Sequence, residues 1–222
     1  MLESKEIHVI FVDDGSTDST HIRLASEFKD FDNFEILRLN QNVGKSNALR
    51  VGMLRALEID FPYIGTFDAD GAISPTDLLT ALSICKLNPD SHLVSGARIL
   101  LAGSDVSRNN FRRWTGRIIA TIIATILRIQ IYDPQSPCKV YRASVLENNL
   151  GDEFRTRWFV DTEIILRSKR SNSESCKVVE FPVVTWRDVE GSHLSILQAL
   201  RVANEIRKLY LLQWQAYPGR EK

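Results

Sequence analysis

The sequence predicts a single α/β domain in which helices flank a mainly parallel sheet. Short β-branched runs alternate with amphipathic stretches along the whole 222-residue chain, and this alternation is typical of βαβ units. Turn residues follow several of the apolar runs, and no repeat, low-complexity tract or linker divides the chain. The length suits one domain with a sizeable core. We therefore expect residues 1–222 to form one domain.

Three strand–helix units are predicted in the first half of the chain. The helices place apolar residues at helical spacing, as Ala48, Val51 and Leu54 show. Ser74 and Pro75 are residue types that favour the N-cap and the first turn of a helix. We predict strands at 7–12, 34–39 and 63–67. The predicted helices are one capped by Thr17 or Asp18 that runs to about residue 29, one over 45–57, and one capped by Ser74.

The second half of the chain predicts a less regular alternation. We expect strands at 93–99, 139–141 and 178–185, a helix opening at 158–163, and a long amphipathic helix over 194–214. Residues 96–132 include six arginines and one acidic residue, and they contain an apolar run from Ile118 to Leu127. That run has about half of the ~20 residues that a membrane-spanning helix needs. We therefore expect this run to lie on a surface or to be buried, and not to cross a bilayer.

The composition excludes several classes of protein. The chain has 28 basic and 28 acidic residues, so no chain-wide affinity for nucleic acid is expected. Its N-terminal residues are too polar for a secretory signal, and its three cysteines lie far apart with no CxxC pair. Such cysteine usage is typical of a reducing compartment. We expect a cytoplasmic protein.

Two acidic clusters follow predicted strands. Asp13 and Asp14 come after the first strand, and Asp68 and Asp70 come after the third. Ligands of open α/β sheets lie at the carboxyl ends of the strands. Paired carboxylates there favour a hard divalent cation that completes its shell with water and substrate phosphates. A single aspartate more often caps a helix, and this is the role we expect for Asp18.

Six sequence segments resemble one enzyme family. VDDGSTDST, NQNVGKSNALRVGMLRA and TFDADG, in this order and spacing, resemble inverting family 2 glycosyltransferases of the GT-A fold, whose sheet is Rossmann-like. The later segments DPQSPCKVYR, RWFVDTEIILRS and TWRDVEGSHLS are similar to the subgroup that glycosylates polyprenyl or dolichyl phosphate. The resemblance covers nearly the whole chain.

The resemblance implies a nucleotide-sugar donor, either GDP-mannose or a UDP-sugar. Asp13 and Asp14 would lie against the base and ribose, and Lys45 would lie near the donor. Asp68 and Asp70 would form the D-x-D motif, with Asp70 as the main ligand of Mg or Mn and Asp68 nearer the sugar nucleotide. This metal would hold the diphosphate and offset the charge of the leaving group.

Asp161 occupies the place of the family's catalytic carboxylate. A phosphate acceptor is already an anion at neutral pH, so it hardly needs a base, and Asp161 would then orient other groups. If the acceptor is a sugar hydroxyl, Asp161 becomes the required base. Both alternatives stay open at the level of sequence.

The arginine-rich stretch fits a lipid-phosphate acceptor. Guanidinium groups bind phosphate bidentately, and the neighbouring 118–127 run would rest on a membrane surface or line a prenyl groove. An ordinary buried helix with solvated arginines is the alternative. We expect a peripheral position on the cytoplasmic face of a membrane. The candidate acceptor and phosphate ligands are Arg112, Arg113, Arg117, Gln135, Lys139, Arg187 and Ser192.

One part of the family pattern is absent from this sequence. Family members begin with a strand and helix before the VDDGS strand, whereas this sequence reaches Ile7 almost at once. The sheet is therefore expected to lack a central strand, to expose an edge beside residues 7–12, and to lose part of the nucleotide pocket. We expect an N-terminally truncated domain.

Two other functions compete with glycosyl transfer. TFDADG also resembles the nucleophile turn of haloacid-dehalogenase-type phosphatases, although Ala72 replaces the usual threonine and no later acid pair follows. A catalytically impaired sugar-nucleotide-binding fragment is the second alternative. The set of Asp68, Asp70 and Asp161 argues against it, and the absent first strand argues for it.

Overall fold

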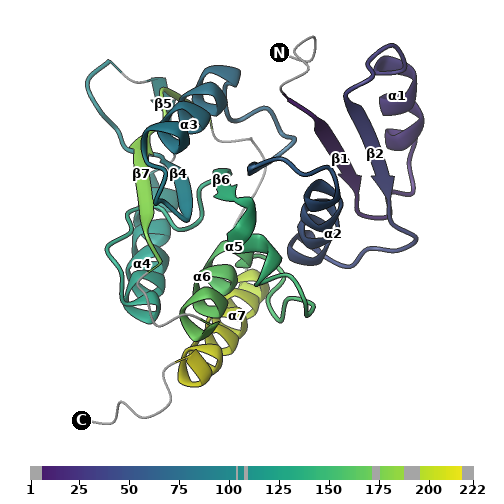
Figure 1. The fold of residues 1–222 in the computed structure, drawn as a ribbon. Helices are drawn as coiled ribbons and strands as arrows, with labels where there is room; N and C mark the ends of the chain where they lie inside the picture. Colours follow the sequence, from purple (N-terminus) through teal and green to yellow (C-terminus); the bar gives the residue numbers. More distant parts are fainter. Residues whose placement is uncertain (1–6, 104, 108–109, 172–175, 188–195, 217–222) are drawn as a thin grey trace.

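The computed structural model describes residues 7–103, 105–107, 110–171, 176–187 and 196–216 (Figure 1). The first half of the chain alternates strands and helices: β1 (Val9–Asp13), α1 (Thr20–Glu27), β2 (Phe34–Arg38), α2 (Lys45–Glu58), β3 (Tyr63–Phe67) and α3 (Pro75–Leu87). The second half comprises β4 (Leu93–Ala97), β5 (Asp105–Ser107), α4 (Asn110–Leu127), β6 (Cys138–Arg142), α5 (Ala143–Glu147), α6 (Val160–Ser171), β7 (Val178–Pro182), β8 (Thr185–Arg187) and α7 (Ile196–Ala216).

Local sequence signals placed most of these elements correctly. The Ser74 hydroxyl accepts the N–H of Asp77 at 3.2 Å, and Pro75 is the first residue of α3. Helix α1 begins at Thr20, two residues after the predicted cap Asp18, and the Asp18 carboxylate accepts the N–H of Thr20 at 2.9 Å. The predicted 178–185 strand is in fact two strands, β7 and β8, which belong to different sheets.

The largest sheet has the strand order β3-β6-β4-β7. Strand β6 runs antiparallel to both of its neighbours, and β4 pairs in parallel with β7. The pairs β1–β2 and β5–β8 are also parallel. Parallel pairing therefore dominates, as the sequence predicted, and β6 is the exception. All five residues of β4 are buried.

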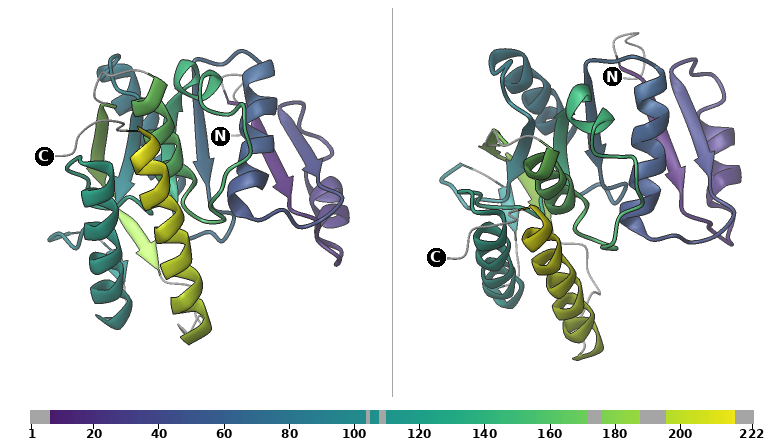
Figure 2. Two further views of the ribbon diagram at one scale, coloured as in Figure 1. Left: turned by 90° about the horizontal axis from the view of Figure 1, so that it is seen from below. Right: turned by 60° about the horizontal axis from the view of Figure 1, so that its bottom comes forward.

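Helices cover both faces of this sheet (Figure 2). Successive strand residues point to opposite faces, so Leu93 and Tyr141 belong to one core cluster and Val94 and Val140 to the other. The first cluster is filled by residues of α4, α5, α6 and α7, such as Leu127 and Leu209. The second is covered by α3. No described helix has the length and apolar character needed to cross a membrane.

Strands β1 and β2 form a separate two-stranded sheet. Among the described residues, β1 pairs with β2 alone, so the other edge of β1 has no hydrogen-bonded partner strand. This agrees with the exposed edge that was predicted beside residues 7–12. Helix α2 packs against both β1 and β3 and connects this pair to the rest of the domain (Figure 1). The sheet is therefore divided between β1 and β3.

Candidate active site

Two adjoining cavities lie where α2, α4, α6 and α7 approach the sheet. The smaller, polar cavity is lined by Lys45 from α2, Asp68 after β3, Lys139 from β6 and Asp161 from α6. The larger, apolar cavity has a volume of about 230 Å³ and lies between α4 and α7. Gln135 and Trp158 line both cavities, so these two residues mark their junction.

The polar cavity contains two ion pairs from four different elements. Lys45 Nζ lies 2.5 Å from Asp68 Oδ1, and both side chains are partly exposed. The Lys139 ammonium pairs with Asp161, and both residues are buried. The two ammonium groups neutralise the two carboxylates. A bound anion or cation would therefore have to exchange with one of these partners.

Both oxygens of the Asp161 carboxylate are engaged by β6. The Lys139 ammonium donates to one oxygen and the Tyr141 hydroxyl to the other. Burial raises the pKa of Tyr141 well above 10, and the charge of Asp161 raises it further. Tyr141 therefore remains a hydrogen-bond donor at neutral pH. Tyr141 was not among the predicted site residues, although it lies two positions after Lys139 on one strand and so points to the same face.

The two carboxylates of the D-x-D turn suit a divalent metal. Asp70 Oδ1 accepts the N–H of Ala72 at 3.0 Å, which fixes the turn after β3. In the described part of the chain, no group of three or more His, Cys, Asp or Glu side chains could hold a metal ion. The protein would therefore supply Asp68 and Asp70, and water and substrate oxygens would complete the shell. This is the arrangement that Mg²⁺ favours with phosphate substrates.

Asp13 and Asp14 accept backbone N–H groups of two different loops, the turn after β1 and the loop before α2. Asp13 is buried and accepts the N–H of Ser16 at 2.8 Å, and the hydrogen bonds from Ser16 lower its pKa. Asp14 accepts the N–H groups of Val43 at 2.7 Å and Gly44 at 3.0 Å. Asp14 therefore orders the loop that presents Lys45. Neither aspartate lines the two cavities described above, and their contact with a donor stays a prediction.

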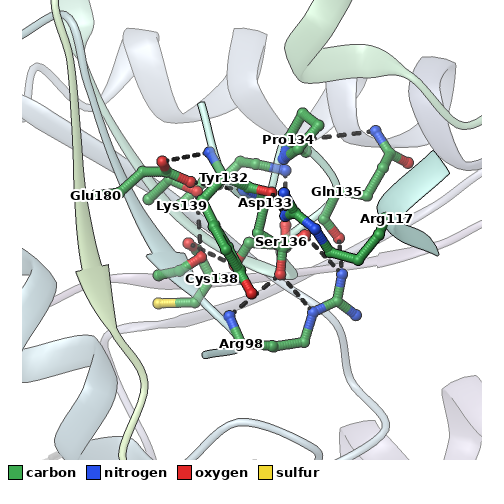
Figure 3. A network of polar contacts seen from close by, with 12 residues as sticks. Arg98, Arg117, Tyr132, Asp133, Pro134, Gln135, Ser136, Cys138, Lys139 and Glu180 are labelled. Carbon is green, nitrogen blue, oxygen red and sulfur yellow. Dashed lines mark hydrogen bonds and ion pairs between the residues drawn. The ribbon is translucent and has the colours of Figure 1, made fainter. Parts of the chain in front are cut away.

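A buried ion pair fixes the segment that leads into β6 (Figure 3). The Arg98 guanidinium donates to both oxygens of Asp133, at 2.6 and 2.8 Å, and to the Gln135 carbonyl at 3.0 Å. Glu180 of β7 accepts the N–H groups of Tyr132 at 2.6 Å and Asp133 at 2.8 Å. These bonds determine where Gln135 and Lys139 lie. Arg98, Asp133 and Glu180 therefore support the site without lining its polar cavity.

Replacing Asp133 by Asn is expected to destabilise the fold in a pH-dependent way. Burial raises the pKa of Asp133, but the hydrogen bonds and charge of Arg98 outweigh it, so the pKa lies below its ordinary 3.8. The pair thus stabilises the native state above that value, and the stabilisation disappears as pH falls through the lowered pKa. Removing one partner of a buried pair costs about 3–5 kcal/mol.

Urea unfolding of both chains between neutral and acidic pH measures this effect. The difference in unfolding free energy between wild type and Asp133→Asn should shrink below about pH 4. The exposed Asp90 provides the control, since Asp90→Asn should change stability by less than ~0.5 kcal/mol. A difference that stays constant with pH would contradict the assignment of the ion pair.

Arg117 belongs to the apolar cavity. It donates to the Tyr132 carbonyl at 2.7 Å, and its guanidinium lies 3.9 Å from the centre of the Tyr132 ring. Ile119 and Ala120 of α4, Val202 of α7 and Trp158 form apolar walls around it. A guanidinium beside apolar walls suits a ligand that has an anionic head and a hydrocarbon part.

Two buried glutamates hold the loop that carries Trp158. Glu163 accepts the N–H groups of Arg155 and Thr156, both at 3.1 Å, and pairs with Arg167 at 2.9 Å. Glu205 of α7 accepts the N–H of Arg157. The Trp158 ring is therefore presented at the junction of the cavities by a well-anchored loop. The i,i+4 spacing of Glu163 and Arg167 is a local signal for their ion pair, whereas no local pattern indicates the bond between Glu205 and Arg157, 48 residues apart.

Four predicted acceptor residues cannot be assigned contacts. Arg112 and Arg113 lie on α4 and Arg187 lies on β8, but their side chains are outside the described part of the structure. Ser192 lies outside the described residues. Their predicted roles stay predictions.

Comparison with known proteins identifies the family. The family described as "Glycosyl transferase family 2" matches residues 2–150, which is more than half of the chain. The chain belongs to glycosyl transferase family 2. Family 2 membership agrees with the D-x-D turn after β3 and argues against the phosphatase alternative for the same turn.

Several curated proteins resemble this family 2 chain over most of its length. Dolichyl-phosphate beta-glucosyltransferase of Saccharomyces cerevisiae is 26% identical, covering 92% of this chain and 65% of its own. The protein of the same name from Dictyostelium discoideum is 30% identical, covering 92% and 63%. Polyprenol monophosphomannose synthase of Mycolicibacterium smegmatis is 27% identical over 64% of this chain and 53% of its own. This chain thus spans about 65% or less of each of these relatives.

Solved structures confirm the fold of the family 2 chain. Glucosyl-3-phosphoglycerate synthase from Mycobacterium tuberculosis, solved with Mn²⁺, UDP and phosphoglyceric acid, superposes with a TM-score of 0.61 at 17% identity. The match covers 94% of this chain and 67% of that one. The GT-A fold that the sequence resemblance predicted is therefore correct.

Proposed function

We propose that this protein transfers a hexose, with inversion, from a nucleotide sugar to a polyprenyl or dolichyl phosphate. The observation that carries the proposal is the junction of a polar cavity, lined by Asp68, Lys139 and Asp161, with an apolar cavity that contains Arg117. The two cavities suit the two substrates of such a reaction. The names of the curated relatives support the lipid-phosphate acceptor.

The donor is proposed to be a UDP-sugar. Glucosyl transfer in the names of the relatives and UDP in the solved neighbours support this choice. GDP-mannose is the second candidate, because one relative is named a phosphomannose synthase. Lys45 would then leave Asp68 for a phosphate oxygen of the donor, since the two side chains are partly exposed and such a surface pair is weak.

Asp68 and Asp70 are proposed to hold Mg²⁺ or Mn²⁺ on the donor diphosphate. When bound, this metal offsets the negative charge that develops on the leaving nucleoside diphosphate. Mn²⁺ in the solved neighbours supports the assignment. The Asp70–Ala72 hydrogen bond keeps one carboxylate at the end of β3, where the metal would bind.

Asp161 is proposed to orient Lys139 and not to act as a general base. Both of its oxygens already accept hydrogen bonds, from Lys139 and Tyr141. A phosphate acceptor attacks as an anion, so no proton has to be removed. The Lys139 ammonium and the Arg117 guanidinium would bind that anion on either side of the Gln135–Trp158 junction. A sugar-hydroxyl acceptor, with Asp161 as base, is less consistent with this carboxylate's occupied oxygens.

Calorimetric titration with UDP, GDP and their sugar conjugates, with and without Mn²⁺, tests the donor site. We expect metal-dependent binding of one nucleotide, and transfer from its sugar conjugate to farnesyl phosphate tests the acceptor. Binding that appears only after an upstream strand and helix are added would support the family function and show that this sequence lacks part of the pocket. No binding in either form would contradict the proposed function.

A further inference from the structure

Large exposed apolar side chains concentrate on two neighbouring helices. Seven of the fifteen exposed large hydrophobic residues in the described part of the chain lie on α4 or α7. On α4, Trp114, Ile118 and Ile122 recur every four residues and so share one face of the helix. Trp114 is 73% exposed and Ile118 is 60% exposed. Contiguous exposed apolar patches are rare on the surfaces of soluble proteins and usually mark binding sites.

The same pattern continues on α7. Leu200, Leu211 and Trp214 are exposed, and Arg207 lies on the same helical face between them. The opposite faces of both helices are anchored in one core, through Ile123 and Leu127 of α4 and Leu209 of α7. Helices α4 and α7 contact each other, and both views in Figure 2 show them side by side. We call the residues Trp114, Ile118, Ile122, Leu200, Tyr210, Leu211 and Trp214 the α4–α7 face.

The charge of these two helices is strongly positive. They carry one acidic residue, Glu205, which is buried, accepts the backbone N–H of Arg157 and pairs with Lys208 at 2.6 Å. Since the whole chain has equal numbers of acidic and basic residues, the positive charge is concentrated locally. The basic residues on the two helices are Arg112, Arg113, Arg117, Arg201, Arg207 and Lys208.

We propose that the α4–α7 face binds the surface of an anionic lipid bilayer. Tryptophan and tyrosine favour the boundary between water and hydrocarbon, and basic side chains near them are attracted to anionic headgroups. The choice of a lipid bilayer as the partner rests on the proposed function, in which the acceptor is a lipid phosphate. Ile119 and Ala120 of α4 and Val202 of α7 line the apolar cavity, so the helices that bind the bilayer also wall the cavity that would receive a lipid-borne acceptor.

Co-sedimentation with vesicles tests the proposal without any catalytic step. The protein should bind vesicles of phosphatidylcholine mixed with phosphatidylserine, and binding should weaken in high salt and on phosphatidylcholine alone. Trp114→Ser and Trp214→Ser should each weaken binding roughly ten-fold or more, because each removes a large side chain from the bilayer. Thermal unfolding of each variant confirms that the fold is retained.

Leu87→Ser and Ile22→Ser are matched controls on α3 and α1. These residues are 80% and 61% exposed, so they have similar exposure outside the α4–α7 face. Both control variants should bind vesicles as tightly as the wild-type protein does. Equal losses in controls and face variants, or no binding to anionic vesicles, would overturn the proposal. A dimer that Trp114→Ser dissociates, without vesicle binding, would assign the face to a second copy of the chain.

The design separates this inference from the proposed function. Transfer to farnesyl phosphate in solution without vesicles should be the same for Trp114→Ser and wild type, since Trp114 lines neither cavity. Transfer without vesicle binding would overturn the bilayer face and leave the function intact. Vesicle binding without transfer by any variant would overturn the proposed function and leave the bilayer-binding face intact.

Discussion

Replacing Asp161 by Asn is expected to lower kcat for glycosyl transfer about 100- to 1,000-fold, the usual cost of losing one group that stabilises developing charge. The reason is indirect, because Asp161 holds the Lys139 ammonium in the polar cavity. Donor affinity should change little, since Asp161 pairs with Lys139, which is proposed to bind the acceptor phosphate, whereas Asp68 pairs with Lys45. Single-turnover transfer and nucleotide titration measure the two quantities separately.

A double-mutant cycle distinguishes positioning from general-base catalysis. If Asp161 acts through Lys139, the double variant Lys139→Met/Asp161→Asn should lose no more activity than either single variant. Independent roles would instead multiply the two losses. Lys139→Met alone leaves a buried carboxylate unpaired at a cost of about 3–5 kcal/mol. The double variant removes both charges and so leaves no buried carboxylate unpaired. If Lys139→Met folds poorly, the activity of the double variant can still be compared with that of Asp161→Asn.

Asp70→Ala is expected to abolish metal-dependent donor binding. Loss of an outer-shell partner of a metal already costs ~10- to 100-fold in metal affinity, and Asp70 is proposed as a direct ligand. Folding should be nearly intact, because the change removes one exposed side chain and one turn hydrogen bond, that to Ala72. Titration of UDP with and without Mn²⁺ measures the effect.

Asp70→Asn separates the charge of Asp70 from its structural bond. The amide oxygen of Asn can still accept the N–H of Ala72, so the turn should persist while metal binding is lost. Asp90→Ala, at an exposed carboxylate outside both cavities, should bind metal and nucleotide like wild type. Metal-dependent binding retained by Asp70→Ala would show that the D-x-D turn is not the metal site.

Periodic local signals made much of the fold predictable. Strand β3 was predicted at its observed bounds, and α2 begins at Lys45 as predicted, because an apolar run and a helical repeat mark them directly. The three-residue strands β5 and β8 and the short helix α5 were missed. Such short elements carry no full period, so their pairing depends on residues far away in the sequence.

The site was predictable only as a set of residue types. Family motifs indicated Asp68, Asp161 and Lys139, and the structure brings these three to one cavity. The sequence did not indicate that Tyr141 and Lys139 occupy both oxygens of Asp161, or that Glu163 and Glu205 anchor the Trp158 loop. The Asp161 and Glu205 bonds join residues 20 or more positions apart, and any acidic residue could form them. Only the tertiary fold selects the partner.

The separate β1–β2 sheet has a consequence for how the domain would respond to the proposed nucleotide-sugar donor. No described apolar side chain before Ala48 is buried, and Phe11, Phe28, Phe31 and Phe34 form a small aromatic cluster outside both main cores. An isolated two-stranded sheet is marginally stable. These N-terminal elements should therefore open as a local cooperative unit at lower free energy than the four-stranded sheet. Asp13 is the last residue of β1 and Asp14 follows it. Binding of a nucleotide that contacts them would therefore be coupled to local folding, and part of its binding free energy would offset the cost of ordering β1 and β2.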